Sequence, residues 1–209
     1  VGSDGLTGGD QGVHHGLVPH LGAGHMTAQV LAQEHSQPQL IVLHLMGSHP
    51  QACDRTQGKY ETFVQSKETS CYLYTMTQTD DLLRKLYDQL RNSGSSFSLV
   101  YFSDHGLAFK ERGKDVQYLA HDDKYQQNFQ VPFMVISSDD KAHRVIKARR
   151  SANDFLGFFS QWTGIKAKEI NIKYPFISEK KAGPIYITNF QLQKVDYNHL
   201  GTDNFDPKP

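Results

Sequence analysis

The sequence predicts an α/β fold in which a mostly parallel β-sheet is flanked by helices. Two patterns support this prediction: strand-like and helix-like segments alternate along the chain, and the strand-like segments are nearly continuous apolar runs. Such runs are typical of parallel strands that are covered on both faces. A chain of 209 residues with 12 Phe and 10 Tyr is also long enough, and aromatic enough, to bury a core.

Residues 1–38 are predicted to be a Gly- and His-rich lead-in that ends in a short helix. The first 26 residues hold eight of the 17 Gly but show no strand or helix period, which indicates a loop. The helix is expected over 26–34, and Pro38 ends it. Four His of this region are interpreted as structural or incidental, with metal binding as the alternative: His14, His15, His20 and His25.

Residues 39–190 are predicted to form the folded part of the chain. The first element is a buried strand over 40–46, which runs into the polar turn Gly47-Ser48-His49. The clearest helix spans 69–91, where a stop signal follows in residues 92–94. Its predicted buried face consists of residues at helical spacing: Tyr72, Met76, Thr79, Leu83, Leu86 and Leu90.

Two more strands and a helix are expected downstream. A strand begins at Phe97 and ends in the polar turn Ser103-Asp104-His105, and another covers 132–137; the connection 107–130 between them shows no strong structure. Ser151 and Asp154 are interpreted as a capping box that opens a helix closed by Gly164. An edge strand is expected over 184–188, and 191–209 are expected to be a polar tail on the surface.

Charge and motif content narrow the function classes. Lys plus Arg and Asp plus Glu number 22 each, so the net charge is zero and nucleic-acid binding is not indicated. The longest apolar run has seven residues, far fewer than the about 20 that a membrane-spanning helix needs. The sequence contains no GxGxxG, Walker, GxSxG or HExxH motif, so nucleotide-cofactor and serine-hydrolase functions lack their usual support.

The two polar strand ends are the main functional signal. In open α/β sheets, ligands bind beyond the carboxyl ends of the strands. Asp104 and His105 leave one strand together, and a mixed oxygen and nitrogen set suits Zn²⁺, or Mn²⁺, better than Ca²⁺. The alternative is a strand-end turn in which Asp104 caps backbone amides and His105 has no role.

Other His residues are assigned by their surroundings. His49 ends the first strand, and His121 lies in a loop that can fold back over Asp104 and His105, so all four are candidates for one site that holds a metal or stabilises phosphate charge. His44 has apolar neighbours and is interpreted as a core residue. Three others lie among polar residues and are expected to face solvent: His35, His143 and His199.

The two cysteines, Cys53 and Cys71, are 18 positions apart. In an exported protein they can form a disulfide, whereas in a cytosolic protein two free thiols are equally ordinary. Residue spacing alone leaves both alternatives open.

Six stretches carry a family resemblance in their order and spacing: LIVLHLMGSHP, the Cys-containing loop after it, CYLYTMTQTDDLLRKL, LVYFSDHG, YLAH and QVPFMVIS. Together they resemble the soluble domain of bacterial phosphoethanolamine transferases, in the alkaline phosphatase and sulfatase superfamily. The resemblance runs from about Leu40 to Ile165. It implies an alkaline phosphatase/sulfatase-like α/β fold, of which this chain corresponds to the C-terminal half of the catalytic domain.

The resemblance implies an enzyme at the periplasmic face of the bacterial inner membrane. It would move phosphoethanolamine from phosphatidylethanolamine to a lipopolysaccharide or other glycan acceptor. Asp104 and His105 would ligate zinc, and His49 and His121 would contact the phosphoryl donor or a second metal. Disulfides are common in this region of the family, which favours a bridge between the two cysteines in an oxidising periplasm.

The family's nucleophilic Thr and a further carboxylate ligand have no counterpart in this sequence. The resemblance therefore implies that the missing N-terminal half of the catalytic domain, and a membrane segment, are needed partners, and that this chain alone should be inactive. The chain also departs from the family at Pro50, which follows His49 without the usual Gly, at Tyr74 in place of Asn, and at Leu107 in place of Glu. Two alternatives stay open: a sulfatase or phosphodiesterase of the same superfamily, and a non-catalytic domain that binds metal or glycan.

Overall fold

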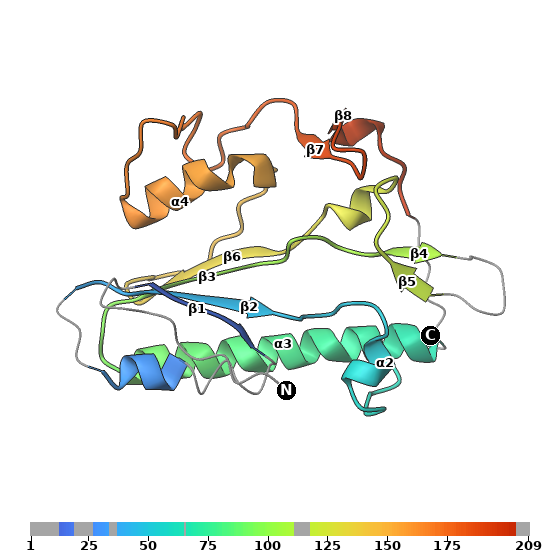
Figure 1. The fold of residues 1–209 in the computed structure, drawn as a ribbon, viewed down its shortest axis with the longest axis horizontal. Coiled ribbons are helices and arrows are strands. Elements are labelled where there is room, and N and C mark those ends of the chain that lie inside the picture. The colour runs from blue at the N-terminus through green and yellow to red at the C-terminus, as the bar shows by residue number, and fades with distance from the viewer. Residues whose placement is uncertain (1–12, 19–26, 34–36, 65, 111–117, 204–209) are drawn as a thin grey trace. The chain divides into compact units, whose positions relative to one another are not determined.

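The computed structural model describes residues 13–18, 27–33, 37–64, 66–110 and 118–203. The chain divides into two compact units (Figure 1). Unit 1 consists of residues 1–99, 135–139 and 206–209, and unit 2 consists of residues 100–134 and 140–205. Both units contain helices and strands, and the α/β class is confirmed.

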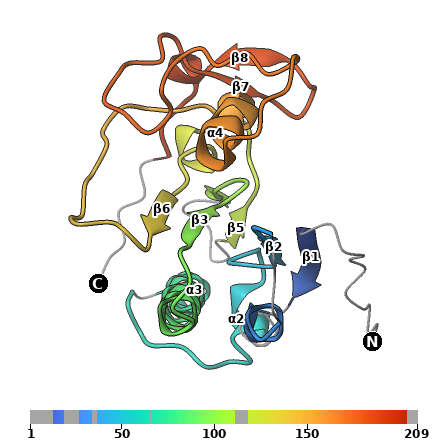
Figure 2. The ribbon, with the colours of Figure 1, turned by 90° about the vertical axis from the view of Figure 1, so that its left-hand side faces the viewer.

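Unit 1 contains a parallel strand pair beside the longest helix of the described chain (Figure 1 and Figure 2). Residues 27–31 are helical, as the sequence predicts. The other elements that lie wholly in this unit are β1 (Val13–Val18), β2 (Leu40–Leu45), α2 (Ala52–Arg55) and α3 (Lys67–Asn92). The predicted strand over 40–46 and the predicted helix over 69–91 are thus confirmed as β2 and α3.

Strand β1 is a correction to the prediction for the lead-in. It pairs with β2 in parallel register, with Val13 opposite Leu40 and Val18 opposite Leu45. The segment was expected to be a loop because Gly and His interrupt any strand pattern, but a partner strand supplies backbone hydrogen bonds that composition does not reveal. Among the four His of the lead-in, His14 and His15 lie in β1, while His20 and His25 fall outside the described residues.

The buried face of α3 is turned by about one residue from the prediction. Its middle buries Cys71, Thr75, Thr79, Leu82 and Leu86, whereas Met76 is 41% exposed. Specific contacts fix this face: Leu82 and Leu86 pack against Leu43 and Leu45 of β2. The prediction of Thr79 and Leu86 is confirmed, whereas the periodicity missed Thr75, whose hydroxyl donates to the Tyr72 carbonyl.

The apolar run of β2 predicts a strand that is buried on both faces, but the side chains of β2 alternate in exposure and one face is open. Leu43 and Leu45 turn toward α3, and the alternate side chains of a strand point the other way. Val42 is accordingly 38% exposed and Met46 48% exposed. His44 shares the exposed face, so its assignment as a core residue was wrong.

The disulfide between Cys53 and Cys71 forms, which settles the alternative left open by the spacing. The two Cα atoms are 5.0 Å apart, and the bond joins α2 to α3. The Glu68 carboxylate adds a second link, because it accepts a hydrogen bond of 2.8 Å from the Ala52 N–H.

Strands β3 (Ser98–Phe102) and β6 (Phe133–Ser137) form a two-stranded sheet and match the strands expected from Phe97 and over 132–137. The remaining elements belong to unit 2: β4 (Ala108–Lys110), β5 (Tyr118–Ala120), η1 (Gln126–Asn128), η2 (Ala152–Asp154), α4 (Phe155–Thr163), β7 (Tyr186–Thr188), β8 (Lys194–Asp196) and η3 (Tyr197–His199). The pairs β4–β5 and β7–β8 are antiparallel, and each sheet of the described residues has two strands.

Three local predictions for unit 2 have different outcomes. The expected edge strand is β7, but its partner β8 lies in the segment expected to be a polar tail. The helix closed by Gly164 is α4, and Gly164 adopts a positive φ of 76° at its end. Only half of the capping box is confirmed: Ser151 is the N-cap of η2 and accepts from the Asn153 N–H, while the Asp154 carboxylate binds Lys173 and Tyr174.

No helix in the described ranges has the length and apolar character to cross a membrane. His143 and His199 are exposed, as expected, while His35 lies outside the described residues.

Candidate functional site

The turn after β3 brings Asp104 and His105 together in a defined geometry. One Asp104 oxygen accepts a hydrogen bond of 2.9 Å from the His105 N–H, and the Ser103 hydroxyl donates to the His105 carbonyl at 2.8 Å. The other Asp104 oxygen, Oδ2, lies 3.8 Å from Nε2 of His105. The Asp104 side chain is 81% exposed, so its carboxylate is accessible to a ligand. The turn thus also contains the backbone-capping contact that was the alternative prediction.

The His105 ring is held by its other nitrogen. Nδ1 lies 2.8 Å from the Gly106 carbonyl, which can only accept, so Nδ1 carries the proton and Nε2 keeps its lone pair when the ring is neutral. A hydrogen bond of this kind to a backbone carbonyl is typical of metal-binding histidines.

The two donor atoms fit part of a zinc site. Zinc bonds to His nitrogen and carboxylate oxygen are each about 2.0–2.2 Å long. The separation of 3.8 Å between Nε2 and Oδ2 is short enough for one ion to contact both atoms. Among the described residues, however, no three His, Cys, Asp or Glu side chains come close enough together to hold a metal. His105 and Asp104 could therefore supply two of the three or four ligands that zinc takes from proteins.

His121 stacks on His105, as expected for residues of one site. Their ring centroids are 4.0 Å apart and their planes differ by 17°. Because the lone pairs of an imidazole lie in the ring plane, two rings stacked face to face direct their nitrogens within two separate, nearly parallel planes. His105 could thus offer its free nitrogen to a metal, while the separate role of His121 stays a prediction.

The pKa of the His121 imidazole is lowered, first by burial and second by the neighbouring His105. The carboxylates of Asp104 and Asp123 act in the opposite direction and raise this pKa. The edge of the Phe190 ring packs against His121 with 4.7 Å between centroids. Phe190 is 69 positions downstream in sequence, and no local pattern marks it as part of this site.

The connection that carries His121 is more ordered than predicted. Strands β4 and β5 pair within it, and His121 comes directly after β5. The next residue, Asp122, is buried, forms an ion pair with Lys110 and donates its N–H to Asn128 Oδ1 at 2.8 Å. The idea that His121 sits on an unstructured loop was therefore wrong for the described residues.

Asn128 links the two halves of this site and was not predicted from the sequence. Its side-chain oxygen binds the Asp122 N–H, and its backbone carbonyl accepts a hydrogen bond of 2.7 Å from the Gly106 N–H. Asn128 is fully buried. It thus holds the segment that carries His121 against the turn that carries His105. An isolated Asn in a polar loop gives no signal of such a role.

His49 lies in unit 1, in the turn after β2. The turn is tied to α3, because the Thr75 hydroxyl donates to the Ser48 hydroxyl at 2.7 Å. Gly47 has a positive φ of 52°, which starts the turn. His49 is exposed, and its meeting with the other three candidates stays a prediction. Strand β2 pairs with β1 and strand β3 with β6, so the expectation that the two polar strand ends belong to one sheet was wrong for the described strands.

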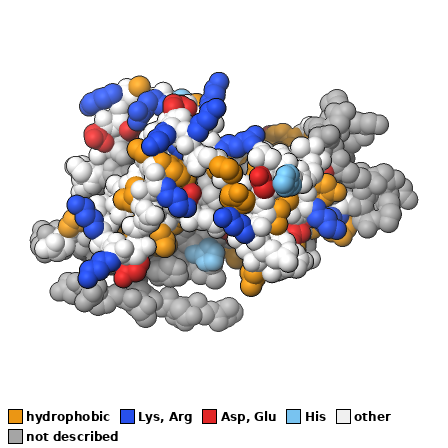
Figure 3. All heavy atoms as spheres, turned by 90° about the horizontal axis from the view of Figure 1, so that it is seen from above, with side chains coloured by type: hydrophobic (Ala, Val, Ile, Leu, Met, Phe, Trp, Pro, Cys, Tyr) orange, Lys and Arg blue, Asp and Glu red, His pale blue; other side chains and the backbone are white. Residues whose placement is uncertain are grey.

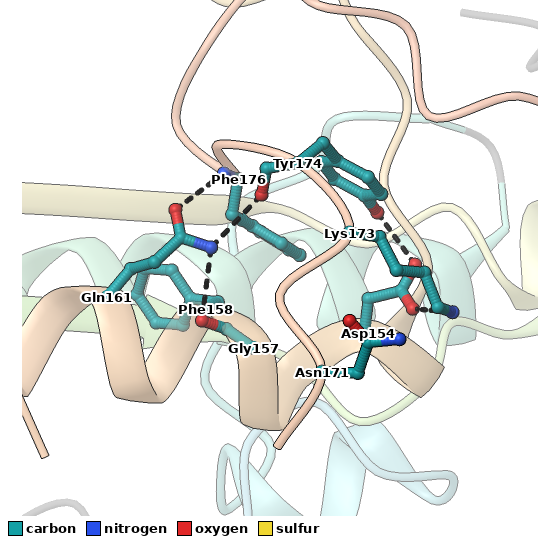
Figure 4. A pocket seen from close by; sticks show the side chains of 8 residues that line it. All are labelled: Asp154, Gly157, Phe158, Gln161, Asn171, Lys173, Tyr174 and Phe176. Atoms are coloured by element: carbon teal, nitrogen blue, oxygen red, sulfur yellow. Dashed lines mark hydrogen bonds and ion pairs between the residues drawn. The ribbon is translucent and has the colours of Figure 1, made fainter. Parts of the chain in front are cut away.

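A second candidate site lies beside α4, where a small pocket is lined by Asp154, Gly157, Phe158, Gln161, Asn171, Lys173, Tyr174 and Phe176 (Figure 4). Gln161 binds the backbone of Gly157, Tyr174 and Phe176 at 3.0–3.1 Å. Asp154 accepts from Lys173 at 2.6 Å and from the Tyr174 hydroxyl at 2.7 Å. The polar groups thus bind one another, and the arrangement serves to hold residues 171–176 on α4.

These contacts shift the pKa values of Asp154 and Tyr174 in opposite directions. Partial burial opposes the charge on Asp154, but the hydrogen bonds from Lys173 and Tyr174 outweigh it and lower the pKa of Asp154. Burial, together with the Asp154 carboxylate, raises the pKa of Tyr174 to about 12.

Comparison with known proteins supports the resemblance seen in the sequence. A "Putative phosphoethanolamine transferase" of Haemophilus influenzae is 36% identical over 102 residues, which cover 44% of this chain and 21% of that protein. "Phosphoethanolamine transferase EptA" of Helicobacter pylori is 26% identical over 146 residues, 62% of this chain and 28% of that protein. The aligned region is thus about a fifth to a quarter of the length of these curated relatives.

Among solved structures, the crystal structure of the C-terminal periplasmic domain of EcEptC from Escherichia coli matches with a TM-score of 0.64 and 17% identity. The match covers 88% of this chain and 58% of that one, and it shows a shared fold. The model of the sulfatase family matches residues 25–165, which include all four candidate site residues. The chain therefore belongs to the sulfatase family.

Proposed function

We propose that this chain is part of a zinc-dependent phosphoethanolamine transferase. The observation that carries the proposal is the pairing of Asp104 Oδ2 with a His105 Nε2 that keeps its lone pair. Family membership and the names of two relatives give the reaction class. The donor we propose is phosphatidylethanolamine, the acceptor a lipopolysaccharide or other glycan, and the location the periplasmic face of the inner membrane.

Asp104 and His105 would hold the zinc ion, which supplies stabilisation of negative charge on a phosphoryl oxygen and a lower pKa for a nucleophilic hydroxyl. The Gly106 carbonyl keeps the His105 ring in the tautomer that leaves Nε2 free to bind. The hydrogen bond from the His105 N–H orients the Asp104 carboxylate toward the same side.

His121 would act beside this pair, on the phosphoryl group. A Thr outside these 209 residues attacks phosphorus, the bond from phosphorus to the diacylglycerol oxygen breaks, and that oxygen takes a proton. The acceptor hydroxyl then attacks the phosphothreonine, loses its proton and restores the Thr. His121, with His49, would neutralise phosphoryl charge or supply the proton to the leaving oxygen. Because the Thr comes from elsewhere, the 209-residue chain alone should not turn over.

The test measures diacylglycerol release from phosphatidylethanolamine vesicles, with and without acceptor glycolipid, by the protein that contains this chain. We expect zinc-dependent release and transfer of phosphoethanolamine to the acceptor, with loss of both in His105→Ala. The matched control is His143→Ala, an exposed His of the same unit, which should keep full activity. Release of free phosphoethanolamine at the same rate without acceptor would favour the phosphodiesterase alternative. Full activity of His105→Ala would contradict the proposal.

A further inference from the structure

Positive charge is concentrated in one segment of unit 2, residues 141–181. This segment holds ten of the 22 Lys and Arg residues but only three of the 22 Asp and Glu residues. Its net charge is therefore +7, although the whole chain has a net charge of zero. The segment includes η2 and α4. It contains none of the four candidate site residues.

Most of these cationic groups are accessible. Nine of the ten side chains are exposed, the exception being Arg150, which donates to the Phe176 and Ser178 carbonyls. Lys173 is the one member of the set that forms an ion pair within the described residues. Arg149 packs on the Tyr197 ring. The other exposed cationic side chains are Lys141, Arg144, Lys147, Lys166, Lys168, Lys180 and Lys181.

Large aliphatic side chains are exposed in the same segment. Five of them are 43–66% exposed: Val145, Leu156, Ile165, Ile172 and Ile177. Figure 3 shows Lys and Arg side chains interspersed with hydrophobic ones on one face of the molecule. Exposed positive charge and exposed aliphatic side chains thus occur within one segment, a combination typical of surfaces that lie in the interface of a lipid bilayer.

The residue types favour a bilayer over the two other common partners of basic surfaces. Seven of the ten cationic residues are Lys, which protein–protein interfaces tend to exclude. The exposed apolar side chains are aliphatic, whereas single-stranded nucleic acids are bound through aromatic stacking. Lys ammonium groups at headgroup phosphates, with aliphatic side chains below them, match both features.

We propose that residues 141–181 form a docking surface for a bilayer that contains anionic phospholipid. The partner is the surface of the membrane, which is distinct from the single lipid that would react near His105. The proposal thus goes beyond the proposed function.

The test is co-sedimentation of the 209-residue chain with vesicles of phosphatidylcholine alone and of phosphatidylcholine with phosphatidylglycerol. We expect binding to the anionic vesicles at low salt and its loss at high salt, because counterions screen the charges. Lys166→Glu with Lys168→Glu should weaken this binding about twentyfold or more, since each Lys near an anionic surface contributes about fivefold. Neither vesicle contains phosphatidylethanolamine, so the result does not depend on transfer chemistry.

The matched control is Lys59→Glu with Lys85→Glu, which reverses two exposed charges of unit 1. It should bind the anionic vesicles within about twofold of the original chain, because the docking surface keeps its charge. A second variant, Leu156→Ser with Ile165→Ser, tests the apolar part and should also weaken binding, with circular dichroism to confirm folding. Equal binding to both vesicle types, or equal weakening by the two charge variants, would overturn the proposal. Self-association that the Leu156 and Ile165 variant abolishes, without vesicle binding, would instead assign the surface to a second copy.

Discussion

Gly106 is the position at which a single methyl group should disturb the candidate site most. A Cβ atom added there would lie 2.3 Å from the Gln127 carbonyl oxygen, far inside any normal contact. That oxygen is backbone and cannot rotate away as a side chain would. It belongs to η1, where Gln126 is bound to Gly201 and Asn128 to Gly106 itself. Gly106→Ala must therefore separate the turn after β3 from η1.

The expected cost follows from two contributions. Forcing extra volume into a packed site costs about 1–3 kcal/mol. The shift also weakens the hydrogen bond of 2.7 Å from the Gly106 N–H to the Asn128 carbonyl, which contributes about 1 kcal/mol. Gly106→Ala should thus lower the free energy of unfolding by about 2–4 kcal/mol and the Tm by about 5–15 °C.

Urea unfolding followed by Trp fluorescence measures this effect, because the single Trp of the chain, Trp162, lies in the same unit. Gly157→Ala is the matched control: its Cβ would lie 3.8 Å from the Asn171 carbonyl, an ordinary contact. Since Gly157 lies inside α4, the control should raise stability by up to about 1 kcal/mol. A Gly106→Ala variant as stable as the original chain would refute the reasoning.

Two further predictions concern stability. Replacing Cys53 and Cys71 by Ser should lower the free energy of unfolding by about 3 kcal/mol, as expected for a loop of this length; an unchanged urea midpoint by circular dichroism would contradict the disulfide's role. Asp154→Asn should cost about 1–2 kcal/mol at pH 7, because it removes a charged acceptor of hydrogen bonds from Lys173 and Tyr174. The folded state lowers the pKa of Asp154, so the original carboxylate stabilises above its unfolded pKa of about 3.9 and loses this advantage as pH falls through the lower folded value. Urea midpoints of the two proteins should therefore converge as the pH falls below about 4, and a constant difference would assign the effect to packing.

The sequence predicted elements where a local pattern determines the outcome. The long helix α3 and the strands β2, β3, β6 and β7 all have apolar or capping signals within their own residues. The pairing of strands is not local, and the prediction failed there: β1 and β8 became visible only through their partners. The same reason explains His44, whose exposure depends on which face of β2 meets α3.

The candidate site was predictable in part for similar reasons. Asp104 and His105 are adjacent in sequence, so their proximity follows from the chain itself. The stacking of His121 on His105 agrees with the expected loop closure. Asn128 and Gly106, which hold these residues in place, act through backbone contacts that no side-chain pattern reveals.

The most direct test of the account measures bound zinc and phosphoethanolamine transfer together in three variants of the protein that contains this chain. Asp104→Ala and His105→Ala should lose both the metal and the activity, because each removes an atom that would bind zinc. His121→Ala should keep the metal and lose mainly the rate of transfer, because its ring stacks face to face on that of His105 and its proposed role is on the phosphoryl group. Equal loss of zinc in all three variants would make His121 a ligand and contradict this division of roles.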